Sequence, residues 1–511
     1  MNVKCEYCKC GIKRRADAHV RAGPLVRLLL AGNWRRVYVE DMKRSTLLCA
    51  VIACVIPVFA QSQQKLITLN VAATTSRDEP LTDLQLSDLQ LREDGKAQPI
   101  VFFHFVGSNR AIAPHSPGEF DNHAAPPPPV VILLDRWNER LVLSGRSGIE
   151  LGAAIQHLET VGNVYIYFLT NKGELVPVHP LPGSDGEVSP VANPSPAELR
   201  AELDHGIEEN QGFRARDDLN VRIQKTFEAL NMLRVRMGAM AGRKTLIWVT
   251  QGIPLTFRVA GSAIIDLAPD VRKLSELAAQ SQVAMYTVDQ TNGVGTDLSR
   301  TLQLFSALTG GRWYTRDNAA SALADAITDA RGSYRIAFYS SGSEKEGKEN
   351  KLRLDTQRKG VRLLTREGFT VEPAGPSPDQ LEAARFNDQI RSPFDAPEIN
   401  LRVAMSRKQQ TDSVHFDIRA DAADVLIQPS GDRYRVELDV IVALYNESSP
   451  KITSPATRVD LTLTKAQLEQ ASSEGVLVPL DVPVSSQVQK LRVMVLDPSL
   501  QALGSVTIPV K

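Results

Sequence analysis

The residue with the clearest potential for chemistry in this 511-residue sequence is an aspartate that ends an apolar run. Asp135 follows the run 130–134, and a polar segment begins directly after it. A buried parallel strand with this pattern delivers an acidic side chain to the carboxyl edge of an α/β sheet, where such folds bind their ligands. Asp135 could hold a divalent cation, act as a catalytic carboxylate, or hydrogen-bond the loop and helix that follow.

The motifs of known enzymes are incomplete in this sequence. A phosphatase that uses Asp135 as a nucleophile needs a second aspartate two residues later, where Trp137 stands. Residues 144–148 have the wrong spacing for the nucleophile turn of an α/β hydrolase. The zinc motif His-Glu-x-x-His and the phosphate-binding motif Gly-x-x-x-x-Gly-Lys do not occur in the sequence. We therefore predict a non-catalytic protein, with a secreted hydrolase that uses Asp135 and Asp289 as an alternative.

The first sixty residues predict export. A Lys-Arg pair precedes the uncharged stretch 45–60, whose apolar part is shorter than the roughly 20 residues of a membrane span. This pattern is typical of a signal peptide over 42–60, with a buried core helix as the alternative. Residues 1–41 are then interpreted as an upstream extension from a wrongly assigned start codon. Zinc binding is a second interpretation of this extension, through Cys5, Cys8, Cys10 and His19.

Removal of this leader would change the composition of the chain. All five cysteines lie within residues 1–60, so the exported protein would be stabilised by its core and not by disulfides. Of the 59 basic and 59 acidic residues, 11 and 4 lie there too, which leaves a net charge of −7. A mildly acidic protein does not fit nucleic-acid binding, which needs a basic surface. We expect no transmembrane helix after signal removal, and a secreted or periplasmic location in the cell envelope.

Alternating strand and helix patterns predict the fold of residues 130–340. Apolar runs at 130–135, 163–170, 244–250 and 283–289 are separated by segments with helical periodicity. Repeated units of this kind form a doubly wound, mostly parallel sheet with helices on both faces. The predicted fold class is therefore α/β and Rossmann-like.

Segments rich in predicted strands flank this region. Residues 61–106 predict an N-terminal β module with a hairpin turn at 93–96, and residues 341–371 predict a β-hairpin around Gly360. Residues 400–511 contain short alternating strands that predict a β-sandwich-like domain. Two linkers are expected: a proline-rich spacer at 107–129 and a Pro/Gly segment at 372–399.

A series of short sequences follows in order over residues 65–371: "LREDGKAQPIVFF", "VVILLDRWN", "GRKTLIWVTQGIP", "VAMYTVDQTNG" and "LTGGRWY". By their number and order, this part of the sequence resembles the secreted von Willebrand factor A-related domain proteins of acidobacteria. The resemblance implies a von Willebrand A-like α/β domain that binds proteins or mediates adhesion.

The wider von Willebrand A fold binds Mg²⁺ through an Asp-x-Ser-x-Ser loop, a threonine in a second loop and an aspartate in a third. By this resemblance Asp135 supplies the first ligand, but Trp137 and Glu139 stand where the two serines belong. Thr250 and Gln251 occupy the third loop in place of Ser-Asp. Because one hard ligand with weak helpers does not dehydrate Mg²⁺ well, we predict a degenerate site with no cofactor, in which Asp135 is a weak candidate ligand.

These inferences combine into one prediction, an exported, non-catalytic protein whose sheet-edge loops bind a protein partner. The alternatives are the hydrolase and a structural component of the cell envelope. Trp137 either anchors the partner as an exposed aromatic or packs onto the adjoining loop. The candidate binding face consists of residues that follow predicted strands: Asp135, Trp137, Asn138, Glu139, Thr250, Gln251 and Asp289.

Overall fold

The computed structural model describes residues 65–510 with gaps at 107–115, 124–127, 140–143, 183–193, 211–218, 239, 241, 259–263, 292–295, 342–347, 371–376, 408–412, 447–448, 453–456 and 485–486. The predicted extension and signal peptide therefore lie outside the described residues. Within the described part of the chain, no helix is long and apolar enough to cross a membrane.

A six-stranded mixed sheet forms the middle of the sequence. From edge to edge its strands are β13 (Trp313–Thr315), β12 (Val283–Asp289), β9 (Lys244–Thr250), β6 (Val130–Asp135), β7 (Val164–Leu169) and β8 (Leu175–His179). β8 is antiparallel to β7, and the other neighbours are parallel. Every residue of β6, β7, β9 and β12 is buried, which explains their continuous apolar runs. The prediction of an α/β sheet is confirmed at this level.

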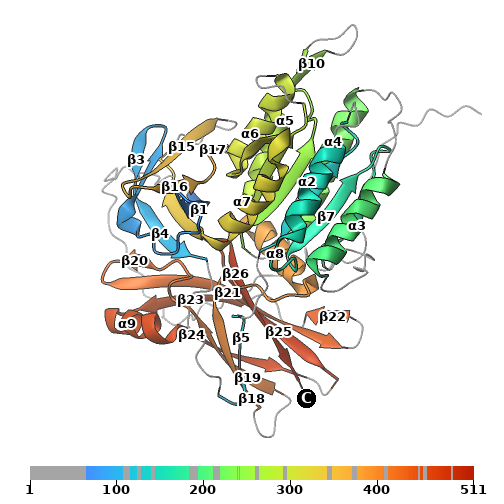
Figure 1. The fold of residues 1–511 in the computed structure, drawn as a ribbon. Coiled ribbons are helices and arrows are strands. Elements are labelled where there is room, and N and C mark those ends of the chain that lie inside the picture. The colour runs from blue at the N-terminus through green and yellow to red at the C-terminus, as the bar shows by residue number, and fades with distance from the viewer. Residues whose placement is uncertain are drawn as a thin grey trace, which may run out of the picture. The chain divides into compact units, whose positions relative to one another are not determined.

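Helices cover both faces of this sheet (Figure 1). On one face, Ile132 and Ile166 of the sheet share a core with α2 (Ser144–Gln156), α3 (Pro196–Glu209) and α7 (Ala319–Arg331). On the other face, Leu133 and Trp248 share a core with α4 (Leu219–Gly238), α5 (Ala268–Gln280) and α6 (Asp297–Thr309). The sheet is thus closed to solvent on both sides, and its strand ends are the places where polar side chains can gather.

The last strand of the region 130–340, which was predicted to form the α/β sheet, joins an antiparallel sheet instead. β14 (Ser333–Tyr339) pairs with β1 (Leu66–Thr75) and β4 (Ile100–Phe105), and β16 (Val361–Leu364) pairs with the other edge of β1. The N-terminal strands therefore share one sheet with strands more than 200 residues later in the sequence. Two short 3₁₀ helices also occur, one before β2 at Leu86–Asp88 and one before α7 at Arg316–Asn318.

A second small sheet contains the expected N-terminal hairpin. β2 (Leu89–Glu93) and β3 (Lys96–Gln98) pair across a turn at Asp94 and Gly95, whose φ angles are +48° and +81°. Positive φ at both turn residues is the geometry that an Asp-Gly turn favours. The hairpin expected around Gly360 differs from the structure. β15 (Glu349–Thr356) pairs with β2 and β17 (Gly368–Thr370), whereas β16 belongs to the sheet of β1.

Two antiparallel sheets share one apolar core in the C-terminal region. The first consists of β24 (Val476–Pro483), β19 (Ser413–Ala420), β18 (Leu401–Arg407) and β5 (Glu119–Asp121). The second consists of β20 (Gln428–Ser430), β21 (Arg433–Asn446), β25 (Lys490–Asp497) and β26 (Ala502–Pro509), with β22 (Ser449–Ile452) and β23 (Thr457–Leu463) also on β21; helix α9 (Lys465–Glu474) precedes β24. β5 comes from the segment expected to be only a spacer, and it pairs with β18.

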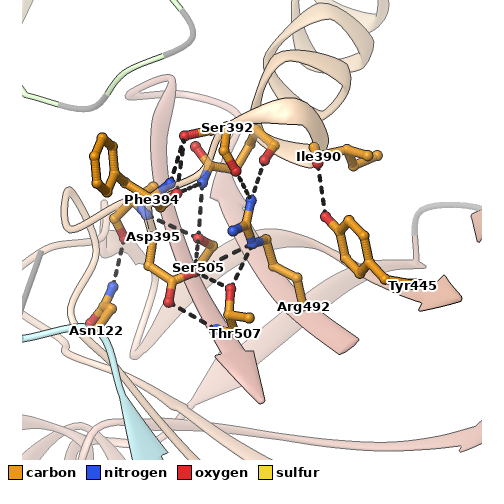
Figure 2. Close-up of polar contacts among 11 residues, drawn as sticks. Asn122, Ile390, Ser392, Phe394, Asp395, Tyr445, Arg492, Ser505 and Thr507 are labelled. Carbon is orange, nitrogen blue, oxygen red and sulfur yellow. Dashed lines mark hydrogen bonds and ion pairs between the residues drawn. The ribbon is translucent and has the colours of Figure 1, made fainter. Parts of the chain in front are cut away.

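Residues 372–399, expected to be a linker, contain helix α8 (Pro378–Arg391). Figure 2 shows that Arg492 of β25 reaches the end of this helix. Its buried guanidinium donates hydrogen bonds to the carbonyl oxygens of Gln389 (2.6 Å) and Ser392 (2.7 Å). Because a cation at this end both satisfies free carbonyls and complements the helix dipole, α8 is fastened to the C-terminal sheets.

Candidate functional site

The candidate site lies where the strand order of the central sheet reverses. β7 and β8 extend from β6 on one side, and β9, β12 and β13 extend on the other. In α/β sheets the carboxyl ends of the strands on either side of such a reversal form the usual ligand site. Leu134 is in register with Val249, so Asp135 and Thr250 end two neighbouring strands side by side.

The carboxylate of Asp135 accepts four hydrogen bonds and is only 4% exposed. Oδ1 accepts from the backbone N–H of Asn138 at 3.0 Å. Oδ2 accepts from Asn138 Nδ2 (2.7 Å), Thr250 Oγ1 (2.7 Å) and Trp248 Nε1 (3.1 Å). Burial raises the pKa of Asp135 above its ordinary value, and the hydrogen bonds from Asn138, Thr250 and Trp248 oppose that rise. Of the three roles considered for Asp135, the geometry matches the hydrogen bonding of a following loop.

The same network reaches helix α4. Asn138 Nδ2 donates to Thr226 Oγ1 at 2.8 Å, and Thr226 donates to the carbonyl oxygen of Arg222 at 2.8 Å. Trp137 Nε1 donates to the same carbonyl oxygen at 3.1 Å. The loop after β6 is therefore tied both to the next strand and to the helix that covers it.

Trp137 is part of the core and not an exposed anchor. It is 4% exposed and belongs to the apolar cluster between the sheet and α4, α5 and α6. Gly173, in the turn after β7, approaches the indole closely, since a Cβ at that position would lie 3.3 Å from ring atoms. Of the two interpretations of Trp137, the structure has the packed one. The apolar ring fills the space beside β7, and its N–H finds a carbonyl, as buried indoles require.

The other predicted site residues lie at the same edge in separate contacts. Asp289 accepts hydrogen bonds from Thr291 N (2.8 Å), Thr291 Oγ1 (2.6 Å) and Ser299 Oγ (2.5 Å). Glu139 forms an ion pair with Arg136 at 2.9 Å, and Gln251 is 7% exposed. The structure thus joins Asp135, Asn138 and Thr250 in one network, while Asp289 organises the start of α6.

Two residues of the network were not predicted. Trp248 and Thr226 supply a donor and a bridging hydroxyl. A tryptophan in a fully apolar strand must place its N–H on an acceptor, and this requirement was the available signal for Trp248. Thr226 has no comparable signal, because its helix is recognised only by its apolar positions.

The residues around Asp135 do not fit a magnesium site. Magnesium needs several oxygen ligands in near-octahedral geometry. The groups directed at this carboxylate include an indole N–H and an amide NH₂, which cannot ligate a cation. Glu139 is engaged by Arg136. Among the described residues, no group of three or more His, Cys, Asp or Glu side chains is placed to hold a metal.

A small ribbon follows the site along the chain. β10 (Thr256–Arg258) and β11 (Ile264–Asp266) form a two-stranded antiparallel sheet between Thr250 and α5. Figure 1 shows β10 beyond the ends of α5 and α6. Ile264 is 61% exposed and Ile265 is 38% exposed. Thr256 is held to the start of α6, because its N–H and hydroxyl donate to Asp297 at 3.0 and 3.1 Å.

No family model and no curated protein matches the chain. Among solved structures, the human COPII-coat protein Sec24c is similar over 52% of this chain, with 13% identity and a TM-score of 0.25; the chain covers about half, 48%, of that structure. An aerotolerance-related membrane protein from Bacteroides fragilis is similar over 39% of this chain and 97% of its own, with 12% identity and a TM-score of 0.25. The pilus adhesin SpaC from Lactobacillus rhamnosus GG is similar over 83% and 57%, with 11% identity and a TM-score of 0.24. Similarities at this level do not assign a family.

Proposed function

We propose that this chain is an exported, non-catalytic protein-binding module of adhesion type, built on a von Willebrand A-like α/β domain whose metal site has degenerated. The order of strands in the mixed sheet, with its reversal beside β6 and its antiparallel β8, supports the proposed domain type. The network around Asp135 supports the loss of a metal. Its carboxylate is enclosed by donors from strand β9 and from the loop after β6.

The observation that carries the binding proposal is the exposed apolar surface of the β10–β11 ribbon. Ile264 and Ile265 are neighbours on one short strand, and both are large apolar side chains left in solvent. A two-stranded ribbon has little stability of its own and two open strand edges. Extended partners commonly pair with such edges and place side chains against apolar residues beside them. The proposed partner-binding surface is therefore the ribbon, which follows Thr250 of the Asp135 network along the chain and is held to the start of α6 by Thr256.

Paired substitutions test this proposal. The double variant Ile264→Ser/Ile265→Ser removes apolar surface from the ribbon, whereas Ile149→Ser on α2 is a matched control, since Ile149 is 66% exposed. We expect the double variant to capture at least tenfold less envelope protein than the unsubstituted protein. The control variant should capture as much as the unsubstituted protein. Equal capture by all three proteins, with equal thermal stability, would contradict the ribbon as the binding surface.

The two alternatives make different predictions. A hydrolase that uses Asp135 and Asp289 requires turnover in a broad esterase, phosphatase and glycosidase screen, and loss of that turnover in Asp135→Asn. A structural envelope component requires residues 400–511 for retention in the envelope fraction. Export through residues 42–60 is tested by sequencing the N-terminus of the protein recovered from the periplasm or medium, where we expect Gln61.

A further inference from the structure

A groove opens in the second small sheet, at the place where β3 ends and the chain passes to β4 of another sheet. Its volume is about 540 Å³, within the range of roughly 300–1,000 Å³ that is typical of ligand sites. The lining includes apolar side chains from three elements, Leu86, Leu89, Leu91 and Ile100. Arg92 is the one charged residue among the described residues of the lining. The groove therefore combines an apolar surface with a single positive charge.

Strand β2 has an open edge at this groove. β3 pairs only with residues 91–93 of β2 and is followed by Pro99, which has no backbone N–H to continue the pairing. Leu89 and Gln90 line the groove and pair with β15 on one side, but no strand among the described residues pairs with them on the other. An open strand edge can pair with an extended peptide, whose alternate side chains then enter pockets beside the edge.

The apolar surface of the groove is partly open to solvent. Leu89 and Leu91 are 9% and 2% exposed, whereas Leu86 is 45% exposed and lies in a 3₁₀ helix with no buried residue. A large apolar side chain left in solvent beside an apolar groove offers a contact to an apolar side chain of a ligand.

The charge of Arg92 favours an acidic group on that ligand. Arg92 is exposed, and no carboxylate among the described residues forms an ion pair with it. Arg353 lies directly opposite on β15, and its own guanidinium is paired with Asp355 at 2.9 Å. Like charges that face each other on neighbouring strands repel, so a carboxylate placed at Arg92 would relieve this repulsion as well as form an ion pair.

We propose that this groove binds an extended peptide segment in which an acidic residue lies next to aliphatic residues. The backbone of the peptide pairs with the open edge of β2 at Leu89 and Gln90. An aliphatic side chain enters the groove beside Leu86, and a carboxylate pairs with Arg92. The groove and the β10–β11 ribbon share no residue, so this site is additional to the proposed partner-binding surface.

The probe is a fluorescein-labelled peptide of alternating leucine and glutamate with blocked ends, titrated with the purified protein and followed by fluorescence anisotropy. Two matched peptides, with glutamine in place of glutamate or serine in place of leucine, separate the charge from the apolar contact. We expect saturable binding of the first peptide. Each matched peptide should bind about fivefold more weakly or less well still, since fivefold is near the upper limit for a single exposed charge pair.

Variants of exposed residues locate the binding. Arg92→Gln and Leu86→Ser each change one lining residue, and we expect either variant to bind the leucine-glutamate peptide about fivefold more weakly. Arg353→Gln is the matched control, because it removes the same charge from the neighbouring strand at a position outside the groove lining; its affinity should stay within about twofold of the unsubstituted protein. Equal losses in Arg92→Gln and Arg353→Gln would mean general attraction of charge and would overturn the proposal, as would no saturable binding.

Two further measurements exclude other sites and ligands. Laurate offers an apolar chain and a carboxylate without a peptide backbone, so displacement of the peptide by an equal concentration of laurate would indicate a lipid site and overturn the proposal. The double variant Ile264→Ser/Ile265→Ser should bind the peptide as the unsubstituted protein does. Failure of the groove and failure of the ribbon are therefore distinguishable.

Discussion

Substitution of Asp135 tests whether its four hydrogen bonds hold the carboxyl edge together. In Asp135→Ala, Asn138 Nδ2 keeps Thr226 as an acceptor, and the Thr250 hydroxyl can rotate. Trp248 Nε1 and the backbone N–H of Asn138 have no other acceptor among the contacts described for them. A buried donor left unsatisfied costs about 1–3 kcal/mol, so two of them lower the free energy of unfolding by about 2–6 kcal/mol. This is a large part of the 5–15 kcal/mol of stability that is typical of folded proteins.

Asp135→Asn should cause only part of this loss of stability. With the amide oxygen in the Oδ2 position, the bonds from Trp248, Thr250 and Asn138 Nδ2 are kept, but the new NH₂ faces the backbone N–H of Asn138. One orphaned donor gives a loss of about 1–3 kcal/mol, partly offset because a neutral amide is easier to bury than a carboxylate. The expected order of stability is therefore unsubstituted protein, Asp135→Asn, Asp135→Ala.

The assay is urea denaturation followed by far-UV circular dichroism and tryptophan fluorescence. Asp355→Ala is the matched control, because among the described residues the Asp355 side chain pairs only with exposed Arg353, and such pairs contribute about 0–1 kcal/mol. Stability of Asp135→Ala equal to or above that of the unsubstituted protein would refute the reasoning. Such a result is typical of a residue that a protein retains for its activity although the residue lowers stability.

Three further perturbations have defined outcomes. Trp137→Phe should lower the free energy of unfolding by about 0.5–1.5 kcal/mol through loss of its hydrogen bond to the Arg222 carbonyl oxygen, which keeps the donor Thr226. Partner capture by the folded variant should be unchanged. Burial lowers the pKa of Lys244 to about 7 from its ordinary 10.5, so between these pH values the folded state binds fewer protons than the unfolded state. The free energy of unfolding should therefore rise from pH 7 to pH 10.5. Lys244→Met should abolish this rise. Burial opposes ionisation of Glu398, but Arg385, Arg335 and Lys244 lower its pKa to about 2 from 4.5. The free energy of unfolding should therefore fall as the pH falls from 4.5 to 2. In an acid denaturation series, Glu398→Gln should show a smaller decrease over this pH range.

The parts of the fold that could be predicted are those in which one local signal decides the structure. The strands β6, β7, β9 and β12 are unbroken apolar runs, because both of their faces are covered. The Asp94-Gly95 turn follows from backbone preference alone. The presence of Asp135 and Thr250 at one edge follows from the parallel direction of their strands.

Residues 372–399 were expected to be a linker, but they contain helix α8. α3 and α8 both begin with a proline, at Pro196 and Pro378, inside segments whose composition favours loops. Proline is well tolerated in the first turn of a helix, and each helix is preceded by a capping serine with Glu198 or Gln380 three residues later. The capping residues are thus the local signal for these helices, whereas proline content alone predicts a loop.

Local sequence patterns did not predict which strands pair with each other or which single side chains are buried. The segment around Gly360 has the pattern of a hairpin, but its two strands find better partners in β1 and β2, far away in the sequence. Trp137 follows a strand end in a polar loop, where a sequence pattern favours exposure as much as packing. Its burial depends on α4 and on the turn at Gly173, which close over it only in three dimensions.

The most direct test of the account is a titration of the purified protein with Mg²⁺ and Mn²⁺ by calorimetry, with Asp135→Ala as the comparison. If hydrogen-bond donors have taken the place of a metal around this carboxylate, neither cation binds at micromolar concentration, and the two proteins give the same heats. Saturable micromolar binding that is lost in folded Asp135→Ala would contradict the central claim.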